Sequence, residues 1–202
     1  MVGKAQIHIV IIVEGDTDKV FFDALLKYYR ERSQIALNSC EVCNIKGVTR
    51  YTSKLISKLK NEICPRAKKK GLLLNTVCCS YDTDIFEFSE KPAVDWPRVK
   101  REVHNLGIKN FCEIKVQHMI EDWFLEDING LCQFLKIDVP PNLMGKSAFE
   151  KMQNLFKKGN KVYLKGNSCQ KFISYLDLHL IRERRKTEFR KLEGLLGVRL
   201  KA

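Results

Sequence analysis

The chain has 202 residues, of which 45% are hydrophobic, so it is long enough for one domain with a core, and global disorder is excluded. Its formal net charge of +12 favours a polyanionic partner such as nucleic acid; an acidic membrane surface and a merely soluble basic protein are the alternatives. No apolar run reaches 18 residues and no signal-peptide pattern opens the chain, so we expect a cytoplasmic protein without a membrane span.

Strands and helices are expected to alternate over the first 136 residues, because short apolar runs are followed by segments with apolar side chains at helical spacing. The predicted strands are 7–13, 40–45, 72–80 and 111–116, and the predicted helices are 16–32, 52–63, 96–106 and 120–135. Asp16 is expected to cap the first helix. Pro65 is expected to end the second helix, which leaves 66–70 as a basic loop.

The composition changes after residue 136, where a proline-containing linker, 137–145, precedes segments with helical patterns only. These helices are predicted over 148–157, 168–184 and 188–196. The expected fold class is therefore α/β: a Rossmann-like parallel four-stranded sheet flanked by helices in residues 1–136. Residues 137–202 are expected to form a helical C-terminal extension packed on that domain.

Carboxylates follow two of the predicted strands directly. Glu14 ends the first strand, and Asp82 and Asp84 follow the third. Ligands of open α/β sheets collect at the carboxyl ends of the strands, so we expect these acids to be neighbours, with Asp18 one turn into the first helix leaning back toward them. Because clustered carboxylates repel one another, the pattern indicates a divalent cation, Mg²⁺ or Mn²⁺, held by hard oxygen ligands. The alternative is that these acids only complement a helix start and form a turn.

A strand followed by Glu14-Gly15, and a later strand followed by Asp82-Thr83-Asp84, resembles the Toprim domain of nucleases, primases and topoisomerases. The resemblance covers roughly residues 7–136 and implies a Toprim-like fold. It also implies that Glu14 acts as general acid or base and that Asp82 and Asp84 hold the metal, with Asp18 at a position that is acidic in the nuclease branch.

A third segment, residues 118–127, is similar to small bacterial Toprim proteins near the overcoming-lysogenization-defect nucleases, many of which are associated with phage defence. This likeness implies Glu121 as a further metal ligand and Lys165 as the lysine that meets transition-state charge. The alternatives are an acidic first helical turn and a solvated loop lysine. The larger relatives carry an ATPase half that this chain lacks, which makes a separate ATPase partner a hypothesis.

Three basic clusters suit a nucleic-acid partner read through its backbone, and two of them supply the residues that we expect to bind it. These residues are Lys68, Lys69, Lys70, Arg184, Arg185 and Lys186. The prediction is a metal-dependent nuclease that hydrolyses phosphodiester bonds of DNA or RNA. A non-catalytic nucleic-acid-binding or regulatory subunit and a nucleotidyl transferase are the alternatives, and the pattern does not indicate an oligomeric state.

Overall fold

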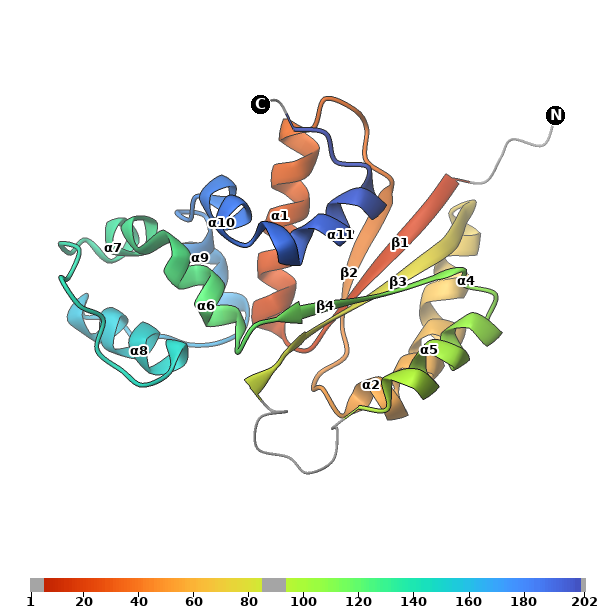
Figure 1. Cartoon of the computed structure of the whole chain (residues 1–202), viewed down its shortest axis with the longest axis horizontal. Helices are drawn as coiled ribbons and strands as arrows, with labels where there is room; N and C mark the ends of the chain where they lie inside the picture. Colours follow the sequence, from red (N-terminus) through yellow and green to blue (C-terminus); the bar gives the residue numbers. More distant parts are fainter. Residues whose placement is uncertain (1–5, 85–93, 201–202) are drawn as a thin grey trace.

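A computed structural model describes residues 6–84 and 94–200 of the chain. Its centre is a four-stranded sheet in the order β2-β1-β3-β4, and every neighbouring pair of strands is parallel (Figure 1). The strands are β1 (Gln6–Val13), β2 (Ser39–Asn44), β3 (Leu72–Asp82) and β4 (Asn110–Val116). The predicted α/β class with a parallel four-stranded sheet flanked by helices is thus confirmed.

The strand β1 lies between β2 and β3 and is apolar on both of its faces. Residues 9–13 have no exposed surface, and their side chains alternate between two hydrophobic clusters on the two sides of the sheet. Ile9 and Ile11 belong to one cluster, whereas Val10 and Ile12 belong to the other. Burial on both sides requires a layer of helices on each face, which makes the architecture helix, sheet, helix.

One face of the sheet carries the first and the last helix, and the other C-terminal helices extend the same hydrophobic cluster beyond the ends of the strands (Figure 1). These elements are α1 (Asp16–Arg32), α6 (Ile120–Phe124), α7 (Ile128–Leu135), α8 (Ala148–Lys158), α9 (Gln170–Ile173), α10 (Leu178–Arg184) and α11 (Lys186–Leu196). Aromatic rings join them: Trp123 lies 5.4 Å from Phe21 and 4.6 Å from Phe189 between ring centroids. The C-terminal helices therefore share a hydrophobic core with α1, and the proposed domain division at residue 136 stays a prediction.

The other face is covered by helices between β2 and β4 (Figure 1). These are α2 (Arg50–Ser53), α3 (Leu55–Lys58), a π-helical turn η1 (Leu59–Ile63), α4 (Cys64–Lys69) and α5 (Trp96–Asn105). The expectation that Pro65 ends a helix is wrong, and so is the basic loop at 66–70, because Pro65 lies in the first turn of α4 and the helix continues to Lys69. Proline fits there since the first turn of a helix needs no N–H donor, and the π-helical turn lies directly before it.

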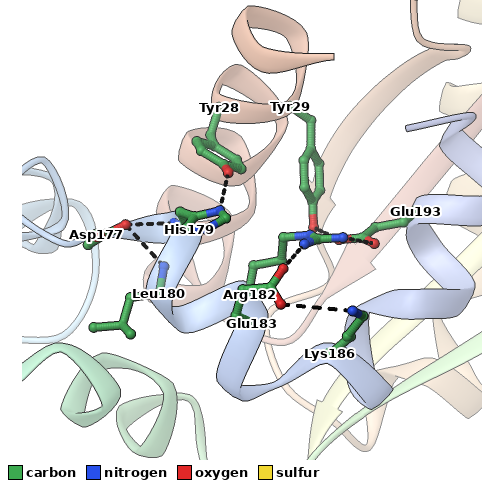
Figure 2. A network of polar contacts seen from close by, with 9 residues as sticks. All are labelled: Tyr28, Tyr29, Asp177, His179, Leu180, Arg182, Glu183, Lys186 and Glu193. Atoms are coloured by element: carbon green, nitrogen blue, oxygen red, sulfur yellow. Dashed lines mark hydrogen bonds and ion pairs between the residues drawn. The ribbon is translucent and has the colours of Figure 1, made fainter. Parts of the chain in front are cut away.

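Two long predicted helices are each interrupted by an aspartate. The helix predicted over 120–135 breaks into α6, a 3₁₀ turn η3 (Leu125–Asp127) and α7, because the Asp127 carboxylate accepts hydrogen bonds from the N–H groups of Gly130 and Asp177. The helix predicted over 168–184 breaks into a 3₁₀ turn η4 (Asn167–Cys169), α9 and α10. Asp177 caps α10 through the N–H groups of His179 and Leu180 (Figure 2).

A buried polar network fastens α10 and α11 to α1. Arg182 donates to both carboxylate oxygens of Glu193, at 2.6 and 3.0 Å, and the Tyr29 hydroxyl donates to the same carboxylate at 2.7 Å (Figure 2). Tyr29 is fully buried, so its hydroxyl requires such a partner. Across the described ranges, no helix is both long and apolar enough to cross a bilayer.

Candidate functional site

The site begins where the two central strands end. Glu14 follows β1, Asp82 is the last residue of β3, and these strands are neighbours in the sheet. The Glu14 Oε1 atom accepts a hydrogen bond of 2.9 Å from the backbone N–H of Asp82. The side chain of Glu14 therefore points across the sheet edge toward Asp82, as the position of the two acids in the sequence led us to expect.

The first turn of α1 adds a third carboxylate. Asp18 is only 6% exposed, and a Cβ atom at Gly15 would lie 3.1 Å from its Oδ2 atom, so glycine leaves the room that this carboxylate needs. The prediction that Asp16 caps α1 is wrong: Gly15 is the N-cap and makes no side-chain cap bond. Asp16 lies one residue later, and its carboxylate accepts a 2.7 Å hydrogen bond from Asn44.

Glu121 comes from the first turn of α6 and has no exposed surface. Its Oε1 atom accepts a 2.8 Å hydrogen bond from the Tyr163 hydroxyl and lies 3.0 Å from the Lys165 ammonium. The same oxygen therefore receives a buried hydroxyl donor and a positive charge. A fully buried carboxylate needs such compensation, because removing its charge from water is costly.

Lys165 reaches the pocket because its loop is bonded to the start of α1. The Thr17 hydroxyl accepts a 2.7 Å hydrogen bond from the N–H of Gly166, the residue after the lysine. Gly166 has a φ of +95°, a conformation that favours glycine. Together these groups line a pocket of about 390 Å³, whose lining is Glu14, Gly15, Asp16, Thr17, Asp18, Asp82, Ile120, Lys165 and Gly166.

Burial and mutual repulsion shift the protonation of these acids. Burial, followed by the charges of Asp18 and Glu14, raises the pKa of Asp82 to about 9. Burial with the nearby charges of Asp18 and Asp84 raises the pKa of Glu14 to about 7, and burial with Glu121 raises that of Asp18 to about 6. The pocket thus disfavours the full negative charge of its own carboxylates.

Lys165 carries the opposite charge at the same place. Burial acts to lower its pKa, but the adjacent carboxylate of Glu121, with further contributions from Asp82 and Asp18, raises it above the usual value. The lysine is therefore a fixed cation at neutral pH, and it offsets part of the negative charge of the pocket.

Three carboxylate oxygens of the site are buried and find no hydrogen-bond partner among the described residues, namely Oδ1 of Asp18, Oδ1 of Asp82 and Oε2 of Glu121. Within residues 6–84 and 94–200, no three His, Cys, Asp or Glu side chains form a ready-made coordination group. Mg²⁺ keeps several of its waters and needs only one or two carboxylates, so these hard oxygen donors fit such an ion in their chemistry.

Asp84 lies next to the site, although it is not among the residues that line the pocket. The strand ends at Asp82, and the backbone then turns, with Thr83 accepting a 2.8 Å hydrogen bond from the His118 N–H and the Asp84 N–H donating to the His118 carbonyl. The extended strand therefore ends before Asp84. It is still close enough to raise the pKa values of Glu14 and Asp82.

The residues expected to bind nucleic acid lie away from this pocket. Lys68, Lys69 and Lys70 lie at the end of α4, next to the start of β3, and an eleven-residue strand of about 3.3 Å per residue separates them from the site by about 30 Å (Figure 1).

The second predicted basic cluster is occupied by ion pairs of the protein itself. Arg185 lies 2.6 Å and Arg184 3.6 Å from carboxylate oxygens of Glu126, and Lys186 lies 3.8 Å from Glu183. Arg185 is also largely buried at 20% side-chain exposure. The structure therefore gives Arg184 and Arg185 a role in holding α10 and α11 against η3, and it does not bring them to the acidic pocket.

Two members of the site were not predicted as such. Tyr163 orients Glu121, and Thr17 holds the loop that carries Lys165. The signal for Tyr163 was its position two residues before Lys165, as a large aromatic side chain that is buried between exposed neighbours. Comparison of the chain with protein-family models, with curated proteins and with solved structures finds no match.

Proposed function

We propose that this protein is a metal-dependent phosphodiesterase of the Toprim type that hydrolyses DNA or RNA. One observation carries the proposal: carboxylates from the ends of two parallel strands and from the first turn of α1 line one pocket together with Lys165. The buried carboxylate of Glu121 lies 3.0 Å from the ammonium group of that lysine. Three oxygens of the carboxylates of Asp18, Asp82 and Glu121 find no hydrogen-bond donor in the part of the chain that the structure describes, and a divalent cation is the partner that their shared negative charge favours.

Asp18, Asp82 and Glu121 are the residues that would hold the cation, with Asp84 adding negative charge nearby. When bound, Mg²⁺ or Mn²⁺ supplies Lewis-acid polarisation of the phosphate. Glu14 is suited to proton transfer, because a pKa of about 7 lets it take a proton from the attacking water near neutral pH and return one to the leaving oxygen. Lys165 stabilises the negative charge that grows on the phosphoryl oxygens as water adds to phosphorus and the P–O bond breaks.

The test is cleavage of end-labelled DNA and RNA in the presence of Mg²⁺, Mn²⁺ or EDTA. We expect cleavage with a divalent ion, none with EDTA, and a loss of about 100-fold or more in Glu14→Gln and Asp82→Asn proteins. Asp23→Asn is the matched control, since Asp23 is an exposed acid of α1 that forms an ion pair with Lys19. Cleavage by both pocket variants at the wild-type rate contradicts the proposal.

A non-catalytic, nucleic-acid-binding subunit is the second candidate, and one observation favours it. Lys165 already neutralises Glu121, and the described residues offer no preformed three-ligand group. This candidate predicts salt-sensitive binding without metal-dependent turnover. The resemblance to small Toprim proteins adds two proposals to the first candidate, a role in phage defence and a separate ATPase partner. Co-purification of the chain with an ATPase tests the second of these.

A further inference from the structure

The loop after β2 places a basic row beside the acidic pocket. The row consists of Lys46, Arg50 and Lys54, all exposed, and none of the three has an ion-pair partner within the described residues. The basic side chains of 184–186 form ion pairs, and those of 68–70 lie far from the pocket. The row, in contrast, is unpaired within the described residues and begins next to Glu14.

Hydrogen bonds fix the start of the row against Glu14. The N–H of Gly47 donates to the Glu14 carbonyl at 2.8 Å, and the N–H of Ile45 donates to the carbonyl of Val13, also at 2.8 Å. Asn44 reaches the first turn of α1 through Asp16. Lys46 therefore directly precedes the residue whose N–H is bonded to the backbone of Glu14, at the carboxyl end of the sheet.

The backbone of Lys46 is held in an unusual conformation. Its φ is +61°, in the left-handed region that few residues other than glycine adopt, and its N–H lies 2.5 Å from the side-chain oxygen of Asn44. A solvated helix face explains an exposed charge such as Arg50, but it does not explain why a lysine occupies a strained position next to Glu14. Such positions gather at functional sites because the surrounding contacts hold them there.

The rest of the row is held under the same edge of the sheet. Arg50 donates its N–H to the Gly47 carbonyl at 3.1 Å, and Lys54, one helical turn later, donates its N–H to the Arg50 carbonyl at 2.7 Å. Tyr51 is fully buried, and its hydroxyl bonds the carbonyls of Ile12 and Ser80, each two residues before a carboxylate of the pocket. Figure 1 shows α2 near the ends of the strands.

We infer that Lys46, Arg50 and Lys54 form the path along which the phosphate backbone of the polynucleotide enters the acidic pocket. This inference rests on the proposed function, since it takes a phosphodiester as the substrate. A polyanion approaching Glu14, Asp18 and Asp82 meets repulsion, and a row of cations that is unpaired within the described residues and begins next to Glu14 offsets it. Residues spaced by one helical turn contact successive charges of the backbone without reading bases.

The experiment measures binding rather than cleavage, so it can fail independently of the proposed function. Fluorescence anisotropy with labelled single-stranded DNA, single-stranded RNA and duplex DNA is recorded in EDTA at several salt concentrations. The test variant carries Lys46→Asn, Arg50→Gln and Lys54→Gln together; Asn tolerates the positive φ of position 46. The control variant carries Lys68→Gln, Lys69→Gln and Lys70→Gln, which removes the same charge from the opposite end of the sheet.

Log affinity falls with log salt, and we expect this fall to be less steep than in the wild type by about 2 to 3 for the test variant and by less than about 1 for the control variant. The polymer that shows this loss identifies the substrate class. The inference is overturned if the test variant binds each polymer like the wild type, if the control loses as much, or if the wild-type chain binds none of them. The single variants Arg50→Gln and Lys54→Gln, both at exposed positions, repeat the measurement if the triple variant unfolds.

Discussion

Replacing Asp82 by Asn removes the most disfavoured charge of the pocket, and we expect the metal-free protein to gain stability. Folding raises the pKa of this carboxyl from 3.8 to about 9, first through burial and then through Asp18 and Glu14. The folded state therefore holds the Asp82 proton more tightly than the unfolded state. By linkage, the contribution of the protonated Asp82 carboxyl to the stability of the wild type is fully present below about pH 4 and is lost as the pH rises toward 9.

The magnitude follows from the same shift. At pH 7 the unfolded carboxyl is fully ionised, and the span from 3.8 to 7 corresponds to about 4 kcal/mol at 1.36 kcal/mol per pH unit. Glu14 and Asp18 take up protons in part at this pH, which removes some of the repulsion. We therefore expect Asp82→Asn to stabilise the protein by about 2 kcal/mol at pH 7, which raises Tm by about 4 to 8 °C for a chain of this size.

Thermal unfolding in EDTA at pH 5, 6, 7 and 8 measures this prediction. The gain in Tm of Asp82→Asn over the wild type should grow with pH, while activity is lost. Asp23→Asn, at an exposed position, should show neither the gain nor its growth. The reasoning is refuted if Asp82→Asn is less stable than the wild type at pH 7, or if the difference does not change with pH.

Divalent ions should reverse the order of stability of the wild type and Asp82→Asn. An ion present at about 100 times its Kd adds about 2.7 kcal/mol to the stability of a protein that binds it only when folded. We expect Mg²⁺ or Mn²⁺ to raise the Tm of the wild type and to raise that of Asp82→Asn much less, because the variant lacks one ligand. A wild-type Tm that saturating Mg²⁺ and Mn²⁺ leave unchanged argues for the non-catalytic candidate.

Two further substitutions test the groups around Glu121. Lys165→Met should slow cleavage about 100- to 1,000-fold in single-turnover assays, whereas Lys171→Met, at an exposed position of α9, should not; equal rates for both proteins exclude Lys165 from catalysis. Tyr163→Phe removes one donor from Glu121 and should lower the free energy of unfolding by about 1 to 2 kcal/mol in urea, against almost nothing for Tyr175→Phe, whose ring is 48% exposed; equal losses in the two proteins contradict the assigned hydrogen bond.

The sequence predicted the sheet and its acidic edge because both depend on local patterns. A run such as 9–13 is buried on both faces, which only a central parallel strand allows, and parallel strands end at the same edge. Glu14 and Asp82 were therefore predictable as neighbours from their places at strand ends, and the structure links them by a hydrogen bond. The direction of Asp84 is not fixed by such a local pattern, because the backbone turns after Asp82 with hydrogen bonds to His118, 36 residues later.

The predicted helix boundaries are wrong where side chains from distant segments decide where a helix ends. Asp127 interrupts its helix by accepting the N–H of Asp177, 50 residues later, and no pattern within 120–135 contains that partner. The prediction for Pro65 was wrong for a different reason. Proline ends helices in general, but the first turn of a helix accepts it, and the spacing of apolar residues does not indicate the π-helical turn before it.

The basic residues show most clearly what composition leaves out. A net charge of +12 predicts a polyanion without saying where it binds, and the densest runs of the sequence, 68–70 and 184–186, were the natural choices. The fold separates the first from the pocket by the length of β3 and pairs Arg185 of the second with Glu126. Lys46, alone in its stretch of sequence, lies beside Glu14 because β2 is parallel to β1 and ends next to it. A parallel topology thus makes the charges that follow each strand, rather than the densest charges, the ones that meet a substrate at the carboxyl edge.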